Sequence, residues 1–142
     1  MSHRRNLAAI AALIIVAITA TTAFAVTPKP GRYYETRGDG IAVLVVQLYV
    51  DDSGTITSVS GTNPDCTGAG GLPQGFGLPK EIKVKRGKFA YHGKADNNIY
   101  GSGPRKLDLD LTGKFATSTK LMGSYKIADC PKLRFETTYQ AQ

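Results

Sequence analysis

Asp108 and Asp110, two residues apart, are the first pair in this sequence whose spacing suggests catalysis or metal binding. A carboxylate pair does acid and base work when one member lies in an apolar pocket and titrates apart from the other. Ca²⁺ needs six to eight oxygen ligands, and no EF-hand loop is present to supply them. Because "LDLDLTGKF" alternates apolar and polar residues, we expect both aspartates to be solvated side chains on the wet face of a strand.

His92 is the one histidine beyond the first few residues, so any Ser-His-Asp or Cys-His arrangement has to use it. The sequence contains neither Gly-x-Ser-x-Gly nor His-Glu-x-x-His. We therefore assign no catalytic residue. A small hydrolase or isomerase that uses His92 with nearby acids remains an alternative.

A glycine-rich stretch, residues 61–79, suggests a phosphate-binding loop at first sight. A P-loop leads into a helix, whereas "EIKVK", which follows here, has the pattern of a strand. We expect a long irregular connection pinned by Cys66. Because long loops inside compact domains are often functional, it is a candidate for ligand contact.

A basic segment runs from Lys80 to Lys94, with six Lys and Arg residues against Glu81 alone. A two-residue turn at Arg86 and Gly87 would build a hairpin from it. The expected cross-strand pairs are Lys85 with Lys88, Val84 with Phe89, Ile82 with Tyr91 and Glu81 with His92. Since like charges opposite each other destabilise a hairpin, an anionic partner is one way to relieve this arrangement, and solvation with edge protection is the other.

The N-terminus has the layout of a secretory signal: two arginines, an apolar run and a small-x-small triplet at residues 23–25. An uncleaved membrane anchor is the alternative, since residues 7–25 are long enough to span a bilayer. We expect a signal peptide at residues 1–25 and a single domain at 26–142 in a secreted or extracytoplasmic protein. The net charge of +7 then falls to (18 − 2) − 11 = +5, the same surplus that the basic segment carries.

Both cysteines, Cys66 and Cys130, lie in the expected exported domain. In an oxidising compartment they are expected to form a disulfide. Zinc usually takes four ligands, and with His92 as the single available histidine we expect no metal site.

The elements between these residues are short β-rich segments separated by turn residues, without a helical period over ten or more residues. We expect an all-β fold of roughly eight to nine short strands. An antiparallel β-sandwich, jelly-roll-like or Ig-like, is the favoured architecture, and a small barrel is the alternative. Residues 41–50 are apolar on both faces and are expected to form a strand covered on both sides.

Residues 107–127 are expected to fold into a hairpin that turns about Ser118, with a loop of three or five residues. Its apolar face would pair Leu109 with Ile127, Leu111 with Tyr125, Gly113 with Gly123 and Phe115 with Leu121. Its polar face would pair Asp110 with Lys126, Thr112 with Ser124 and Lys114 with Met122. The facing glycines leave a bare patch for an aromatic ring, expected from Phe89, Tyr91 or Phe135.

The order "PGRYYE", "AVLVVQLYVDDSGTITSVS", "IKVKRGKFAY" and "LTGKFATSTKLMGSYKI", with one cysteine after the second segment and one after the fourth, carries a resemblance. It resembles a group of small secreted bacterial β-proteins of unassigned function over most of residues 26–142. The resemblance implies a β-sandwich and brings no catalytic residues.

The sequence thus predicts a secreted, non-catalytic binding or cell-surface accessory domain without a cofactor. Lys83, Lys85, Arg86 and Lys88 are the candidate electrostatic contacts, with the glycine-rich stretch beside them. An anionic cell-wall polymer, a membrane surface or a secreted protein is the expected partner. Nucleic acid is not expected, since no recognition motif for it is present. An inhibitor that presents the disulfide-pinned loop to a secreted enzyme is a further alternative.

Overall fold

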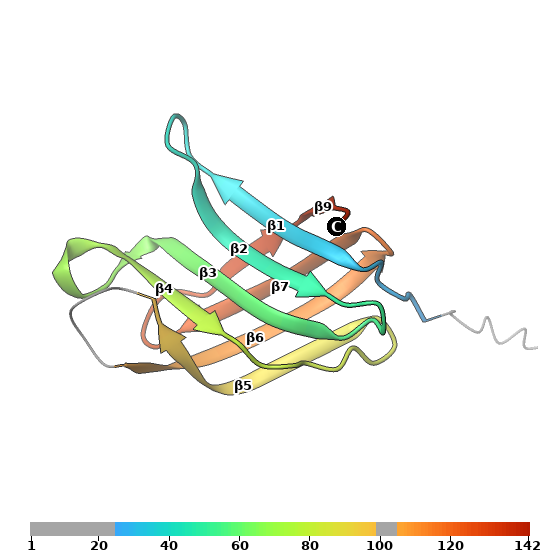
Figure 1. The fold of residues 1–142 in the computed structure, drawn as a ribbon. Helices are drawn as coiled ribbons and strands as arrows, with labels where there is room; N and C mark the ends of the chain where they lie inside the picture. The colour runs from blue at the N-terminus through green and yellow to red at the C-terminus, as the bar shows by residue number, and fades with distance from the viewer. Residues whose placement is uncertain (1–24, 99–104) are drawn as a thin grey trace, which may run out of the picture.

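A computed structural model of the chain describes residues 25–98 and 105–142, which form nine strands in one antiparallel sheet (Figure 1). The predicted signal peptide, apart from its last residue, lies outside the described residues. The strands are β1 (Gly31–Arg37), β2 (Val43–Val50), β3 (Ile56–Thr67), β4 (Pro73–Leu78), β5 (Lys88–Asn97), β6 (Lys106–Thr117), β7 (Lys120–Ile127), β8 (Leu133–Glu136) and β9 (Thr138–Gln140).

The sheet curls into a nearly closed barrel. Strands β1 to β7 each pair with the next strand in sequence, while β9 returns to pair with β1. Because only Thr137 separates β8 from β9, the last stretch of chain bridges the two edges of the sheet. The all-β prediction is confirmed, whereas a two-sheet sandwich is not observed and the small-barrel alternative fits. Alternating strands look the same in both architectures, so the sequence pattern does not separate them.

Aromatic side chains fill the interior of the barrel. Tyr33 meets Phe115 edge to face with ring centroids 5.2 Å apart, and Phe76 meets Tyr125 at 5.0 Å. The Tyr125 hydroxyl donates to the carbonyl of Val45 at 2.7 Å, and burial raises the pKa of Tyr125. The register of β1 with β2 skips Val45, so this bulge offers its carbonyl to a ring from the opposite wall.

Strand β2 is covered on one side only, which corrects the expectation for residues 41–50. Val46, Leu48, Val50 and the bulged Val45 are buried, whereas Gln47 and Tyr49 are partly exposed. Ile41, before the strand, is 91% exposed. An apolar residue on the outer face of a barrel has no second layer to cover it, and the sequence alone does not reveal that absence.

The β6–β7 hairpin confirms every predicted cross-strand pair on both faces. The turn differs from the prediction. Thr117 pairs with Lys120, so the loop is the two residues Ser118 and Thr119, and Ala116 is skipped as a bulge. Inserting one bulged residue shortens the loop without changing which side chains face inward.

The facing glycines, Gly113 and Gly123, make room for two phenylalanines, as predicted. A Cβ added at Gly113 would overlap the ring of Phe89. At Gly123 it would overlap both the ring of Phe135 and the backbone carbonyl of Thr112. A side chain at either position would therefore displace a neighbouring group, so the close packing here requires glycine at both.

A disulfide joins Cys66 to Cys130, with the two Cα atoms 5.6 Å apart, as the sequence predicts. It links the end of β3 to the turn between β7 and β8, and Asn63 adds a hydrogen bond to the carbonyl of Pro131 at 3.0 Å. In the chain-entropy description, a loop of this length stabilises by about 4 kcal/mol. One end of the barrel is thereby tied across its opening.

The glycine-rich stretch is not a long irregular loop, contrary to the prediction. Strand β3 continues to Thr67 and β4 begins at Pro73, with a 3₁₀ turn at Ala69–Gly71 between them. Gly61 and Gly75 lie within paired strands. At Gly61 an added Cβ would meet the carbonyl of Val45 at 2.5 Å, so close packing explains this glycine better than flexibility does.

Candidate functional site

The turn at Arg86 and Gly87 forms as predicted. Lys85 and Lys88 exchange two backbone hydrogen bonds, of 2.8 and 3.0 Å, and both turn residues have positive φ. This is the turn type that suits a two-residue hairpin. The amide of Phe115 donates to the carbonyl of Gly87 at 2.8 Å, so the turn is fixed to strand β6.

Beyond this first pair the predicted hairpin does not close. Ile82 pairs with Ile56 at the start of β3 through two backbone hydrogen bonds, of 2.8 and 3.1 Å, and not with Tyr91. The segment of residues 79–87 therefore lies against β3 and runs beside β5 without a ladder (Figure 1). Ile82 is buried in the core, and this burial holds the segment where it is.

A seam thus separates residues 79–87 from β5. Strand β5 pairs with β6 from Lys88 to Asp96, but with β4 it pairs only at Asn97 and Asp96. A groove of about 700 Å³ lies in the seam. Its lining residues are Glu81, Ile82, Lys83, Lys85, Lys88, Phe89, Ala90, Tyr91, Thr112 and Gly113.

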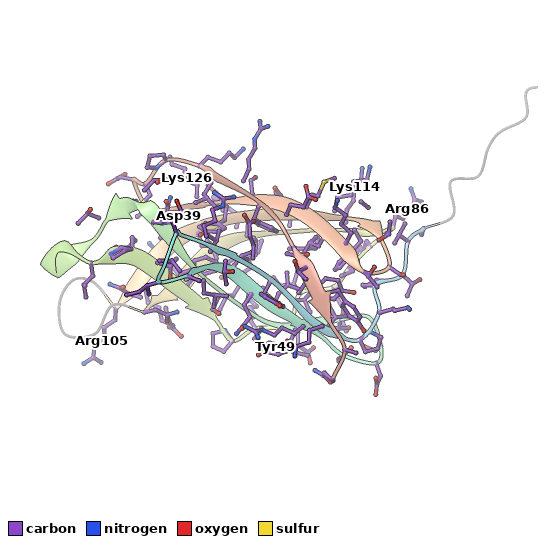
Figure 2. All side chains as sticks on the ribbon, turned by 90° about the horizontal axis from the view of Figure 1, so that it is seen from above. Asp39, Tyr49, Arg86, Arg105, Lys114 and Lys126 are labelled. Atoms are coloured by element: carbon purple, nitrogen blue, oxygen red, sulfur yellow. A yellow bond between two sulfur atoms is a disulfide. The ribbon has the colours of Figure 1, made fainter. Side chains whose placement is uncertain are left out.

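Three lysines form a continuous cross-strand row next to this groove. Lys85 pairs with Lys88, and Lys88 pairs with Lys114 on β6. We call Lys85, Lys88 and Lys114 the lysine row. Arg86 stands at the turn beside it, and Figure 2 shows Arg86 and Lys114 at the same end of the molecule, with Arg105 at the other. Within the described part of the chain, none of these basic residues forms an ion pair.

The remaining charges of β5 each face an opposite charge. Lys94 contacts Asp108 at 2.7 Å, and Asp96 contacts Lys106. The hydrogen bond to Lys94 lowers the pKa of the Asp108 carboxyl. Both predicted aspartates on β6 are exposed side chains, as expected.

His92 faces Asp110 and not Glu81, because β5 pairs with β6 and residues 80–83 do not join it. The imidazole Nδ1 donates a hydrogen bond to the Asp110 carboxylate, and this bond and the negative charge of Asp110 raise the pKa of His92. The imidazole is exposed on the outer face of the barrel. Its hydrogen-bond partner among the described residues is this carboxylate, so the geometry shows an ion pair and no nucleophile beside it.

Four of the lysine and arginine residues that the sequence singles out do gather here: Lys83, Lys85, Arg86 and Lys88 are all exposed at this end of the barrel. The Nζ of Lys83 lies 3.4 Å from the Thr55 hydroxyl, so that side chain leans toward the β2–β3 turn. The glycine-rich stretch does not lie beside them. Its turn is at the far end of β3, near the disulfide.

Sequence reasoning missed two contributors to the site. Lys114 belongs to another hairpin, and only the pairing of β5 with β6 brings it next to Lys88. The second contributor is Tyr91. Its hydroxyl donates to the carbonyl of Lys94 at 2.6 Å, and the Nζ of Lys80 lies 5.7 Å from the centre of its ring. The alternation of Lys114 with Phe115 was the available signal that Lys114 points outward.

No family model, curated protein or solved structure matches this chain. Across residues 25–98 and 105–142, no three His, Cys, Asp or Glu side chains gather in a way that could hold a metal ion. The same residues contain no helix long and apolar enough to cross a membrane.

Proposed function

We propose that this protein is a secreted, non-catalytic binding module that contacts an anionic polymer or surface through the lysine row, Lys83 and Arg86. The observation that carries the proposal is the unbalanced charge of the row. On the same two strands, His92, Lys94 and Lys106 each have an acid opposite them, whereas Lys85, Lys88 and Lys114 face one another.

The energetic argument favours a bound anion. Like charges on directly opposite residues destabilise a sheet by a few tenths of a kcal/mol up to about 1. A polyanion that lies along the row replaces this repulsion with attraction, and several adjacent cations raise the local concentration of such a ligand. The row is exposed at one end of the barrel, where an extended polymer or a flat surface can reach it.

Co-sedimentation tests this proposal. Purified protein is mixed with bacterial cell walls, or with vesicles of anionic or neutral lipid, at low and high salt. We expect binding to the anionic material that weakens at high salt, because exposed charges are screened within about 8 to 10 Å at physiological ionic strength. The cell-wall and vesicle samples distinguish a polymer from a membrane as the anionic source.

A matched pair of variants locates the surface. Lys85→Glu with Lys88→Glu removes the row, and Lys132→Glu with Arg134→Glu makes the same change in net charge at exposed positions near the disulfide. We expect the first pair to abolish salt-sensitive binding and the second to leave most of it. Equal losses from both pairs, or no binding by the unmodified protein at low salt, would contradict the proposal.

A further inference from the structure

The seam beside β5 presents free backbone groups, and the direction of these groups follows from the hydrogen bonds around them. Lys88 directs both its N–H and its C=O toward Lys85, across the seam. Backbone direction alternates along a strand, so Ala90 and His92 also point into the seam, while Phe89 and Tyr91 point to β6. Neither Ala90 nor His92 has a backbone partner on this side among the described residues.

The opposite side of the seam has the complementary arrangement. Ile82 directs both its backbone groups to Ile56 on β3. By the same alternation, Glu81 and Lys83 point away from β3 and toward β5. Both are exposed, and their backbone groups have no partner in the described part of the chain. The seam therefore has two facing edges that are ready to pair.

The seam is closed at both ends, so it accepts only a short segment. The Lys85–Lys88 pair closes one end, and the pairing of Gly77 with Asp96 closes the other. Near that second end the Tyr91 hydroxyl already occupies the carbonyl of Lys94. A segment of a few residues would have Ala90 and His92 as its partners on β5.

The side chains around the seam indicate the composition of such a segment. Ile82 and Phe89 are buried and Tyr91 is partly buried, so the inner side of the groove is apolar. Lys83, Lys85 and Lys88 line the same groove and are exposed. A strand placed here would alternate apolar residues facing inward with acidic residues facing the lysines.

We propose that the seam binds an extended acidic peptide segment, which adds a strand to β5 through the backbone of Ala90 and His92. This inference rests on the proposed function and specifies the partner as a polypeptide. Phosphate-rich or saccharide polymers supply charge, but only a peptide supplies donors and acceptors at the two-residue repeat of a sheet edge.

Amide hydrogen exchange measured by NMR tests the inference residue by residue. In the free protein we expect the amides of Ala90 and His92 to exchange rapidly, and those of Phe89 and Tyr91 to be protected by pairing with β6. The probe is an acetylated, amidated peptide of alternating glutamate and valine, six residues long. It should slow exchange at Ala90 and His92 at least tenfold.

Two comparison ligands separate this inference from the proposed function. The first is the same peptide with N-methyl groups on alternate residues, which keeps its charge and loses donors. The second is linear polyphosphate. We expect the methylated peptide to bind at least tenfold more weakly, and polyphosphate to bind without protecting Ala90 or His92. If all three ligands bind equally and protect neither amide, anion binding stands and strand addition is overturned.

The remaining outcomes are equally decisive. Binding of none of the ligands contradicts both the inference and the proposed function. Protection of Ala90 and His92 in the free protein would mean that the hairpin closes in solution, which overturns the inference alone.

Ala90→Pro removes one free donor and should weaken binding of the peptide at least tenfold while sparing binding of polyphosphate. Ala90→Val keeps the donor and should bind like the unmodified protein. Exchange in the unmodified protein decides the question if the proline variant does not fold.

Discussion

The β6–β7 hairpin is paired along its whole length, whereas the hairpin at Arg86 and Gly87 pairs only at Lys85 and Lys88. Both have tight two-residue turns and alternating side chains. In the closed hairpin, Asp110 lies opposite Lys126. At the open one, two lysines lie opposite each other.

Competition for the strand is the second difference between the two hairpins. Strand β6 also pairs with β5, and β7 also pairs with β8. Neither of these neighbours competes for the edges along which β6 and β7 pair with each other. At the open hairpin, Ile82 is bonded to Ile56 and buried, so the segment before the turn belongs to β3. A good turn therefore starts a hairpin, but the rest of the barrel decides whether it closes.

The largest expected effect is on the closed hairpin, through Gly123→Val. The added side chain meets the backbone carbonyl of Thr112 as well as the ring of Phe135, and the carbonyl cannot move without breaking the ladder. We expect a loss of about 3 kcal/mol in the free energy of unfolding, at the upper end of overpacking effects. Urea denaturation measures it.

Gly113→Val and Thr112→Val serve as comparisons for that substitution. At Gly113 the added atoms mainly meet the ring of Phe89, a side chain that borders the seam and can shift toward it. Thr112→Val lies on the outer face. The expected order of destabilisation is Gly123, then Gly113, then Thr112. Equal losses at the two glycines would argue against a rigid closed hairpin.

A smaller effect is expected from Lys85→Glu, which places an opposite charge across from Lys88. Cross-strand pairs of opposite charge stabilise by a few tenths of a kcal/mol up to about 1. The stability gain should be of this size and should shrink at high salt. Thermal unfolding at two salt concentrations measures it, and Lys132→Glu, with no charge opposite it in a ladder, controls for net charge. A gain of the same size in the control would attribute the effect to net charge.

The smallest effect concerns the His92–Asp110 pair, since both side chains are exposed, by 88% and 57%. Asp110 raises the pKa of His92 above its ordinary value of about 6.5. The stabilisation that protonated His92 gains from this pair is therefore fully present below the ordinary pKa of about 6.5. It is lost as the pH rises through the higher pKa of the folded state. NMR titration of the imidazole should give a value above 6.5 that Asp110→Asn brings back toward it. An unchanged value in that variant would show that another group causes the shift.

Local pattern predicted much of the fold. The register of β6 with β7 follows from one buried face, because a slip of one residue would expose every leucine. The turn at Arg86 and Gly87 follows from the backbone needs of a two-residue loop, and the disulfide follows from the expectation that both cysteines lie in an oxidising compartment.

The glycine-rich stretch shows where local pattern fails. Glycines at 61, 75 and 77 look like loop residues, but all three lie in paired strands, and at Gly61 the backbone carbonyl of Val45 comes too close for a side chain. Composition does not distinguish a glycine chosen for flexibility from one chosen for close approach.

By itself, the sequence determined which residues alternate, where the chain turns and that positive charge gathers near residue 86, because these depend on neighbours in the chain. Only the tertiary structure decided that the sheet curls into one barrel, that Ile82 pairs with β3, and that Lys114 completes a row with Lys85 and Lys88. These features depend on strands far apart in sequence competing for the same edges. The competition is decided by how much apolar surface each strand arrangement buries. That buried surface depends on the whole folded chain and not on any single segment.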